Sequence, residues 1–327
     1  MWEHDSRLDA KPNFGSLGPG PDVSSDGPIK VVQGGMQAPW AVLAAVLGLL
    51  GAVALRSGVA QVGWQEIGQR LVPLMMKARA PSAKLSAKPS NENPDRNTPQ
   101  GQAELLLEDS VHGDEAAAGE AAARAEQWRG HIQLTSQLSG LITAGLNSND
   151  LHVRATAIEV DLAALDVAKE SGTVDRLEKQ AQAGPQQQRV WALWTLGLLG
   201  NRGVEPDRVN EILSSGLRDP DPEIRHWAVE GMSYLGTDDS LEPLLRTLHD
   251  DASPMVRESA ACGLAQSGMF TDEQRHTVVP RLLDYTEDST LDAPTHAWVY
   301  HALRDITGQN LSDNAAPWRN WYQSASH

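Results

Sequence analysis

Three of the ten histidines and the single cysteine are the residues whose types could support catalysis or metal binding. Imidazole and thiolate groups serve as general bases, nucleophiles and metal ligands. Two histidines on one helix share a metal at positions i and i+4, but His296 and His301 stand five residues apart and His226 has no histidine partner. Cys262 follows two alanines, which favours a buried structural thiol. The sequence also contains no Gly-rich phosphate loop, no HExxH and no nucleophile elbow, so we expect no catalytic, metal or cofactor site.

A recurring helix start positions these residues. In five copies a capping residue stands four positions before an arginine or a histidine, and successive copies are 35, 36, 32 and 39 residues apart. The pairs are Asp150 and Arg154, Pro185 and Arg189, Asp221 and Arg225, Ser253 and Arg257, and Asp292 and His296. Short polar side chains cap helices by accepting hydrogen bonds from the first amides. A helix start repeated at this period predicts a stacked helical solenoid.

Each predicted first helix is followed by a glycine and then by a second apolar helix. Three copies run from the arginine to a glycine in 11 steps, which predicts left-handed C-caps at Gly200, Gly236 and Gly268. Leucines then recur at i, i+3, i+4 and i+7 after the second of these glycines: Leu241, Leu244, Leu245 and Leu248. A lone helical pair cannot bury both of its stripes. We therefore predict an all-α fold, an α-solenoid of about five helical hairpins.

The repeats match a known pattern. The stretch Asp219–Gly236 resembles the HEAT repeat in its short bacterial form, also called the PBS-lyase-type HEAT repeat, and Asp251–Gly268 resembles it almost as closely. The likeness covers about residues 131–310 and implies HEAT-type hairpins. The first copy departs from the pattern by running to Gly172 without a stop, as an N-terminal capping repeat would. The Trp-rich end at residues 317–322 resembles the element that closes some bacterial HEAT arrays.

The resemblance leaves function open, because the family includes scaffolds, adaptors and a few enzymes. Deoxyhypusine hydroxylase, a di-iron HEAT enzyme, places His-Glu dipeptides at the position of His226, but Trp227 stands where the glutamate would be, so a ligand set cannot be assembled. Phycobilin lyases shape a pocket around a tetrapyrrole, and chromophore or cofactor handling of that type is one alternative. A purely structural envelope protein is another. We favour a non-catalytic scaffold that binds a protein partner.

The N-terminal third has a different composition. Residues 36–55 are uncharged over 20 positions, which is enough for a helix to cross about 30 Å of hydrocarbon. The long preceding tail, with a net charge of −2 over residues 1–55, disfavours a cleaved signal peptide. We predict a disordered tail over 1–35, a transmembrane helix over 36–55, a juxtamembrane amphipathic segment over 56–79, a disordered linker over 80–103, an Ala/Glu-rich helix over 104–130 and the solenoid with its Trp-rich cap over 131–327.

Charge divides the chain further. Residues 56–103 carry +4 and residues 104–327 carry −18, which disfavours nucleic acid as a partner, because phosphate-contacting proteins need positive charge along one face. Many acids fall on or beside the predicted second helices, the layer that lines the concave side in HEAT arrays: Glu205, Asp207, Glu211, Asp238, Asp239, Glu242, Asp272, Glu273 and Asp284. They are candidates for binding a protein partner with a basic segment. A solvated surface that maintains solubility is the alternative.

The repeated arginines have a structural interpretation. Arg154, Arg189, Arg225 and Arg257 each follow a cap by one turn, and each is expected to bridge to an aspartate of the adjacent repeat as a structural ladder. Arg208 lies outside this register and is expected to be exposed.

The positions of basic residues beside the predicted membrane helix indicate its orientation. Within 20 residues of that helix, Lys30 stands on one side and Arg56 and Arg70 on the other. Basic residues favour the cytoplasmic side of a membrane helix. We therefore predict a cytoplasmic solenoid.

Overall fold

The computed structural model describes residues 97–325. In this range the regular structure is α-helical apart from one short 3-10 helix, and no strand occurs, so the expected all-α class is confirmed there. No helix in the described range is both long enough and apolar enough to cross a membrane. The predicted tail, transmembrane helix and juxtamembrane segment, and most of the predicted linker, lie outside the described residues.

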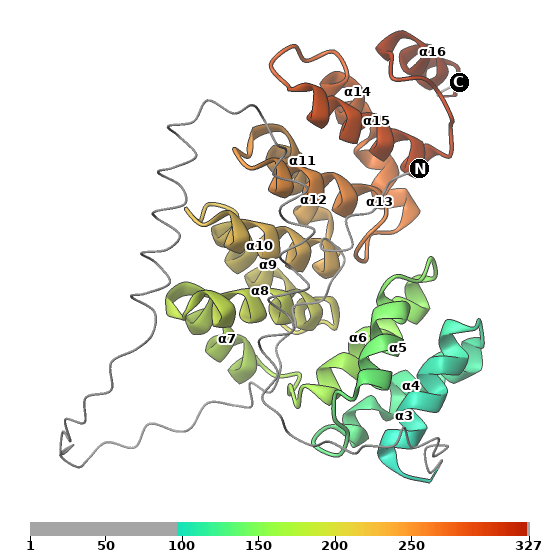
Figure 1. Ribbon diagram of the computed structural model, residues 1–327, viewed down its shortest axis with the longest axis vertical. Coiled ribbons are helices and arrows are strands. Elements are labelled where there is room, and N and C mark those ends of the chain that lie inside the picture. The colour runs from blue at the N-terminus through green and yellow to red at the C-terminus, as the bar shows by residue number, and fades with distance from the viewer. Residues whose placement is uncertain (1–96, 326–327) are drawn as a thin grey trace, which may run out of the picture. The chain divides into compact units, whose positions relative to one another are not determined.

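The first four described helices pack on one another as a group (Figure 1). They are α3 (Pro99–Val111), α4 (Glu115–Trp128), α5 (Ser136–Leu146) and α6 (Leu151–Ala164). The single helix predicted over 104–130 is therefore two helices, and the first begins inside the predicted linker. Thr98 accepts from the amide of Gly101 and starts α3, whereas Gly113 takes a φ of +97° and Asp114 caps α4. Local capping thus interrupts a segment whose composition alone favours one continuous helix.

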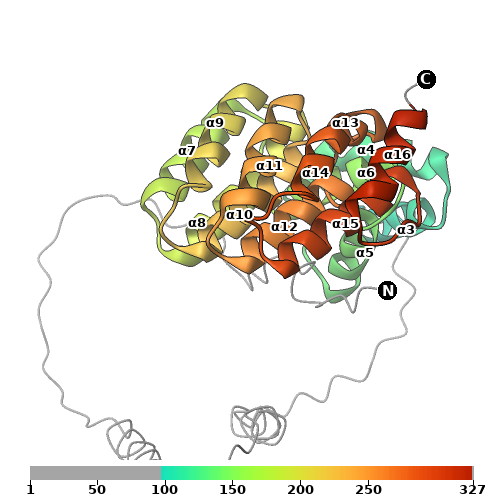
Figure 2. The same cartoon turned by 90° about the horizontal axis from the view of Figure 1, so that it is seen from above.

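The remaining helices form an array of two layers. Its elements are α7 (Ser171–Ala183), α8 (Gln186–Asn201), α9 (Pro206–Gly216), α10 (Pro222–Leu235), η1 (Asp238–Ser240), α11 (Leu241–Asp250), α12 (Pro254–Ala265), α13 (Asp272–Thr277), α14 (Val279–Tyr285), α15 (Ala293–Thr307) and α16 (Ala315–Ala325). Helices α8, α10, α12 and α15 contact one another in order and are called the first-helix layer. Helices α7, α9, α11 and α14 pack against them as the second-helix layer (Figure 2).

The five predicted helix starts are confirmed. The N-cap residues of α6, α8, α10, α12 and α15 are Asp150, Pro185, Asp221, Ser253 and Asp292. The three aspartates each accept from a backbone amide of the first turn. The first copy nevertheless differs from the others, because α6 packs mainly on α4 and α5 and contacts α8 only slightly. Four copies therefore stack directly in the first-helix layer.

The predicted helix ends were partly wrong. Gly236 is the C-cap of α10, with a φ of +67°, as expected. Gly200 instead lies buried inside α8, and Gly203, with a φ of +84°, occupies the left-handed position. The first copy stops at Asp166, with a φ of +52°, six residues before the predicted glycine. Aspartate is among the non-glycine residues that tolerate this conformation, so a search for glycine alone misses such an end.

Glycine has another role between α8 and α10. A Cβ atom at Gly197 would lie 2.2 Å from the carbonyl oxygen of Gly231, which is closer than packed atoms can approach. The two helices therefore meet backbone to backbone at this point. Trp194 packs beside this contact, with its ring centroid 6.0 Å from that of Trp227 and 4.8 Å from that of Tyr234. Small residues and large rings alternate to fill the first-helix layer.

Candidate functional site

Arg225 joins two successive repeats at the loop edge of the first-helix layer. Its Nε and Nη2 atoms donate to the two carboxylate oxygens of Asp251 at 2.7 and 2.9 Å. Its Nη1 atom donates to the carbonyl of Asp219 at 2.9 Å. Only 13% of the Arg225 side chain and 7% of the Asp251 side chain are exposed. The hydrogen bonds to Asp251 raise the pKa of Arg225, so its guanidinium stays charged and forms charge-assisted hydrogen bonds.

The neighbouring repeats use the same arrangement. Arg189 donates to the Asp219 carboxylate, and Arg257 donates from Nη2 to Asp292 at 2.6 Å and from Nη1 to the Asp251 carbonyl at 2.7 Å. Burial opposes the ionisation of Asp219, but hydrogen bonds from Arg189 and from a backbone amide outweigh it and lower the pKa of that carboxyl. These three arginines, which we call the arginine ladder, each connect to an aspartate of the following repeat.

Arg154, the fourth predicted member, has different partners. It donates to the carbonyl of Ser148, just before its own helix, and to the carbonyl of Gly268, in the loop after α12. It thus links the four-helix group to the array. Arg275 lies in the same region and donates to four backbone carbonyls, including those of Leu264 and Ser267. Burial, with a smaller contribution from the charge of Arg154, lowers the pKa of Arg275 to about 10.

Most of the predicted acidic residues lie at the N-terminal ends of α9, η1, α11 and α13. Glu205 is the N-cap of α9, and Asp207 lies in its first turn. Asp238 and Asp239 form η1 just before α11. The Gln274 side chain, at the start of α13, donates to the Asp238 carboxylate at 2.7 Å, so the start of α13 lies beside η1. We call the eight acids Glu205, Asp207, Glu211, Asp238, Asp239, Glu242, Asp272 and Glu273 the acidic edge.

The acidic edge divides into engaged and unengaged carboxylates. Glu205 pairs with Arg208 at 2.9 Å, and Glu242 lies 3.5 Å from Arg246 and 3.9 Å from Arg281. Hydrogen bonds from a backbone amide and from Thr271 lower the pKa of Glu273. Four members are exposed and form no ion pair within residues 97–325: Asp207, Glu211, Asp239 and Asp272. Asp284, also predicted, lies in α14 and pairs with Arg319 at 2.9 Å.

Arg208, which the sequence predicted to be exposed, also forms ion pairs that the sequence did not indicate. It contacts the carboxylates of Asp175 at 2.7 Å and Glu205 at 2.9 Å, and also that of Glu178. It therefore bridges α7 and α9 within the second-helix layer. Its side chain is 37% exposed, which distinguishes this cluster from the arginine ladder.

The histidines considered for metal binding occupy separate environments. His226 is buried, with Nδ1 2.8 Å from the hydroxyl of Ser259. Burial lowers the pKa of this imidazole. Across the described part of the chain, no group of three or more histidine, cysteine, aspartate or glutamate side chains is arranged to hold a metal.

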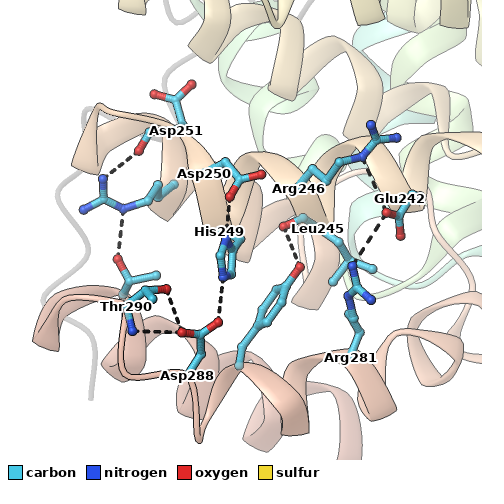
Figure 3. A network of polar contacts seen from close by, with 12 residues as sticks. Glu242, Leu245, Arg246, His249, Asp250, Asp251, Arg281, Asp288 and Thr290 are labelled. Carbon is cyan, nitrogen blue, oxygen red and sulfur yellow. Dashed lines mark hydrogen bonds and ion pairs between the residues drawn. The ribbon is translucent and has the colours of Figure 1, made fainter.

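His249, which no sequence pattern singled out, lies near the end of α11, with its ring beside that of Tyr285 on α14. Figure 3 shows the ring of His249 between the carboxylates of Asp250 and Asp288. It borders an open hollow of about 420 Å³ whose lining also includes Arg281 and Tyr285. His249 precedes Asp288 by 39 residues, which is about one repeat. The helix-start register that predicted the arginine ladder does not include either residue, so no sequence signal indicated this pair.

Comparison with known proteins supports the helical repeat. The pattern of HEAT repeats matches residues 174–265, the segment from α7 to α12. A search of the curated proteins gave no match. A crystal structure described as that of an engineered protein is 17% identical, with 63% of this chain and 96% of the other covered and a TM-score of 0.33. That score is too low to support an inference about fold or function.

Proposed function

We propose that this chain is a non-catalytic HEAT-repeat scaffold whose acidic edge binds a protein partner with a basic segment. The observation that carries the proposal is a set of exposed, unengaged carboxylates. Asp207, Asp239 and Asp272 lie at helix entrances, and Glu211 lies midway along α9. Exposed charges held on rigid elements steer an oppositely charged partner and set its orientation. The HEAT-repeat match over residues 174–265 supports an interaction role in general terms.

The hollow beside His249 bears on chromophore handling, the alternative function. Its lining is charged or polar: Arg246, His249, Asp250, Arg281, Asp284, Tyr285 and Asp288. Pockets for large cofactors are mostly apolar with a few polar groups. The hollow therefore gives a lyase-type role no support.

Site-specific crosslinking tests the interaction surface directly. A photo-crosslinking residue at Asp239, on the acidic edge, is compared in cells with one at Gly119, an exposed position on α4. We expect a discrete adduct from position 239 whose partner contains a Lys/Arg-rich segment, and none from position 119. Equal adducts at both positions, or a partner without a basic segment, would contradict the acidic edge as the binding surface.

The proposal includes a membrane attachment through residues 36–55, with the array on the cytoplasmic side. Its support is the uncharged 20-residue stretch and the basic residues Arg56 and Arg70 that follow it. The full chain should remain in the membrane pellet after alkaline extraction, whereas a chain lacking residues 1–96 should be released. A C-terminal reporter active only outside the cytoplasm would contradict the proposed side.

A further inference from the structure

His249 makes two contacts that only one protonation state can satisfy. Its Nδ1 lies 2.5 Å from a carboxylate oxygen of Asp250, and its Nε2 lies 3.0 Å from one of Asp288. Ionised carboxylates accept hydrogen bonds and cannot donate them. Both ring nitrogens must therefore carry a proton, which makes the ring an imidazolium. A neutral imidazole would leave one nitrogen lone pair facing a carboxylate.

Further contacts fix the positions of Asp288 and of the imidazole ring. Asp288 accepts from the Thr290 amide at 2.8 Å and from the Thr290 hydroxyl at 2.6 Å. These bonds, together with that from His249, hold the pKa of Asp288 well below its usual range. The ring of Tyr285 lies 4.9 Å from that of His249, and its hydroxyl donates to the carbonyl of Leu245 at 3.2 Å. The contact therefore spans α11, α14 and the loop of residues 286–292.

The other charges around the ring do not change near neutral pH. Arg246 on α11 and Arg281 on α14 face Glu242, and Asp284 is paired with Arg319 on α16. Guanidinium groups and paired carboxylates keep their charges between about pH 5 and 8. Burial raises the pKa of Tyr285, which moves its titration further from this range. His249 is therefore the titrating group at this junction.

We propose that His249 is a pH-operated clamp: as an imidazolium it ties the end of α11 to Asp288 in the 286–292 loop, and loss of its proton weakens that tie, because a neutral ring can donate to only one of its two carboxylate partners. The loop leads directly into α15, the last helix of the first-helix layer. Arg257 of the arginine ladder holds Asp292 at the far end of this loop, so loss of the proton would loosen the segment around Asp288 while the ladder keeps the repeats joined. The clamp rests on the contacts of His249 with Asp250 and Asp288, and these do not depend on whether the acidic edge binds a partner.

The direction of the pH effect follows from the two partners. Desolvation lowers the pKa of His249, but hydrogen bonds from the ring to Asp288 and Asp250 outweigh it and leave the pKa raised. The contribution of His249 to stability is therefore complete below its unfolded pKa of about 6.5 and is lost as the pH rises through its higher folded value. Asp288 has the opposite dependence on pH. Because its pKa is lowered, its contribution to stability is complete above about pH 4 and is lost as the pH falls further. The clamp is strongest between about pH 4 and 6.5.

Mass spectrometry of the full chain can measure the protonation of this ring through exchange of its C2 proton. We expect the His249 midpoint to lie above about 6.5, and to fall by about one unit in Asp288→Asn, because one of the two anionic partners is removed. His276, exposed on α13, serves as an internal reference whose midpoint should not respond to that change. A His249 midpoint at or below about 6.5, or one indifferent to Asp288→Asn, would overturn the clamp.

Amide hydrogen exchange measures whether the clamp holds the loop. After correction for intrinsic rates, protection of residues 286–292 should fall several-fold between about pH 6 and 8 in the unmodified chain, because the raised pKa of His249 places the loss of its proton in this range. His249→Gln should show the low protection at both pH values, and α8 should be unaffected in either chain. Equal pH responses of residues 286–292 in the two chains would show that His249 does not hold the loop.

Discussion

The first-helix layer and the second-helix layer use charge in opposite ways. In the first layer Arg225 and Asp251 are 13% and 7% exposed and form a bidentate pair across two repeats. In the second layer the acids Asp207 and Asp239 are exposed at helix entrances and form no ion pair in the described range. Removing one partner of the first-layer pair leaves the other charge with little access to water. Removing an exposed acid of the second layer leaves no unpaired charge behind, because that acid interacts only with solvent.

This difference in burial and ion pairing separates the charges that stabilise the fold from those that are available to a partner. Both layers contain charged residues of the same types, so the net charge of −18 over residues 104–327 does not distinguish them. The burial and the ion pairing of the individual side chains distinguish the two layers. Substitutions in the first layer should therefore change stability, and substitutions on the acidic edge should change association.

Gly197→Ala should have the largest effect on stability. The added methyl would lie 2.2 Å from the Gly231 carbonyl oxygen, and a backbone atom cannot swing aside as a flexible side chain can. Helices α8 and α10 would have to separate, at a cost of about 3 kcal/mol or more. The free energy of unfolding from urea titration measures this loss.

Gly140→Ala is the matched control for that substitution. Gly140 is also inside a helix, α5, but a Cβ there would meet nothing within 4 Å. Alanine should therefore stabilise this position by about 0.5–1 kcal/mol. Equal losses at the two glycines would show that helix propensity, and not the close approach of α8 and α10, determines the result.

Arg225→Ala should have the next largest effect. It removes two hydrogen bonds to Asp251 and one to the Asp219 carbonyl, and it leaves the buried Asp251 carboxylate without its cation. Loss of charge-assisted bonds of this kind destabilises by about 1–3 kcal/mol. Arg218→Ala, at an exposed position, should stay within about 0.5 kcal/mol of the unmodified chain. Indistinguishable urea midpoints for the two variants would show that the arginine ladder does not stabilise the fold.

Arg208→Ala tests whether exposure or the number of partners decides the outcome. Arg208 contacts three carboxylates, more than Arg225 does, but its side chain is 37% exposed. Exposed ion pairs contribute little because solvent screens them, so the loss of stability should be smaller than for Arg225→Ala. A larger loss would mean that the second-helix layer depends on its charges as much as the first.

The sequence was sufficient to predict the repeat because its signals are local. A cap such as Asp221 and a left-handed glycine such as Gly236 act within one turn of backbone, so their positions could be inferred before the structure was known. The sequence could not show that Gly203, and not Gly200, takes the left-handed position at the end of α8. Both glycines are compatible with a helix end, and Gly200 lies inside the helix, packed against Leu235.

Contacts between distant segments were the part that could not be predicted. Arg154 reaches the Gly268 carbonyl across 114 residues, and no repeat spacing indicates this, because the four-helix group does not continue the stacking of the array. The separation of the acidic edge into engaged and unengaged members has the same origin. It depends on where Arg246 and Arg281 come to lie, at 3.5 and 3.9 Å from Glu242.

The smallest change in stability, and the largest in association, is expected from charge reversal on the acidic edge. The structure favours Asp207→Lys, Glu211→Lys and Asp239→Lys together, because these acids form no ion pair within residues 97–325. Asp207 lies in the first turn of α9, where a negative charge interacts favourably with the helix dipole by about 0.3–1 kcal/mol. A loss of stability of about that size is therefore expected in any case.

The partner captured at position 239 should associate with the reversed chain at least about tenfold more slowly, since electrostatic steering is lost. Raising the salt from low to physiological strength should slow the unmodified chain markedly, because exposed charges are then screened over about 8–10 Å, and should slow the reversed chain much less. A companion triple of Asp238→Lys, Asp239→Lys and Glu242→Lys should lose more stability, since it removes the acceptor of Gln274 and places a lysine beside Arg246. Association indifferent to both triples and to salt would place the binding surface elsewhere, for which the end formed by Trp321 and Tyr322 on α16 is the next surface to substitute.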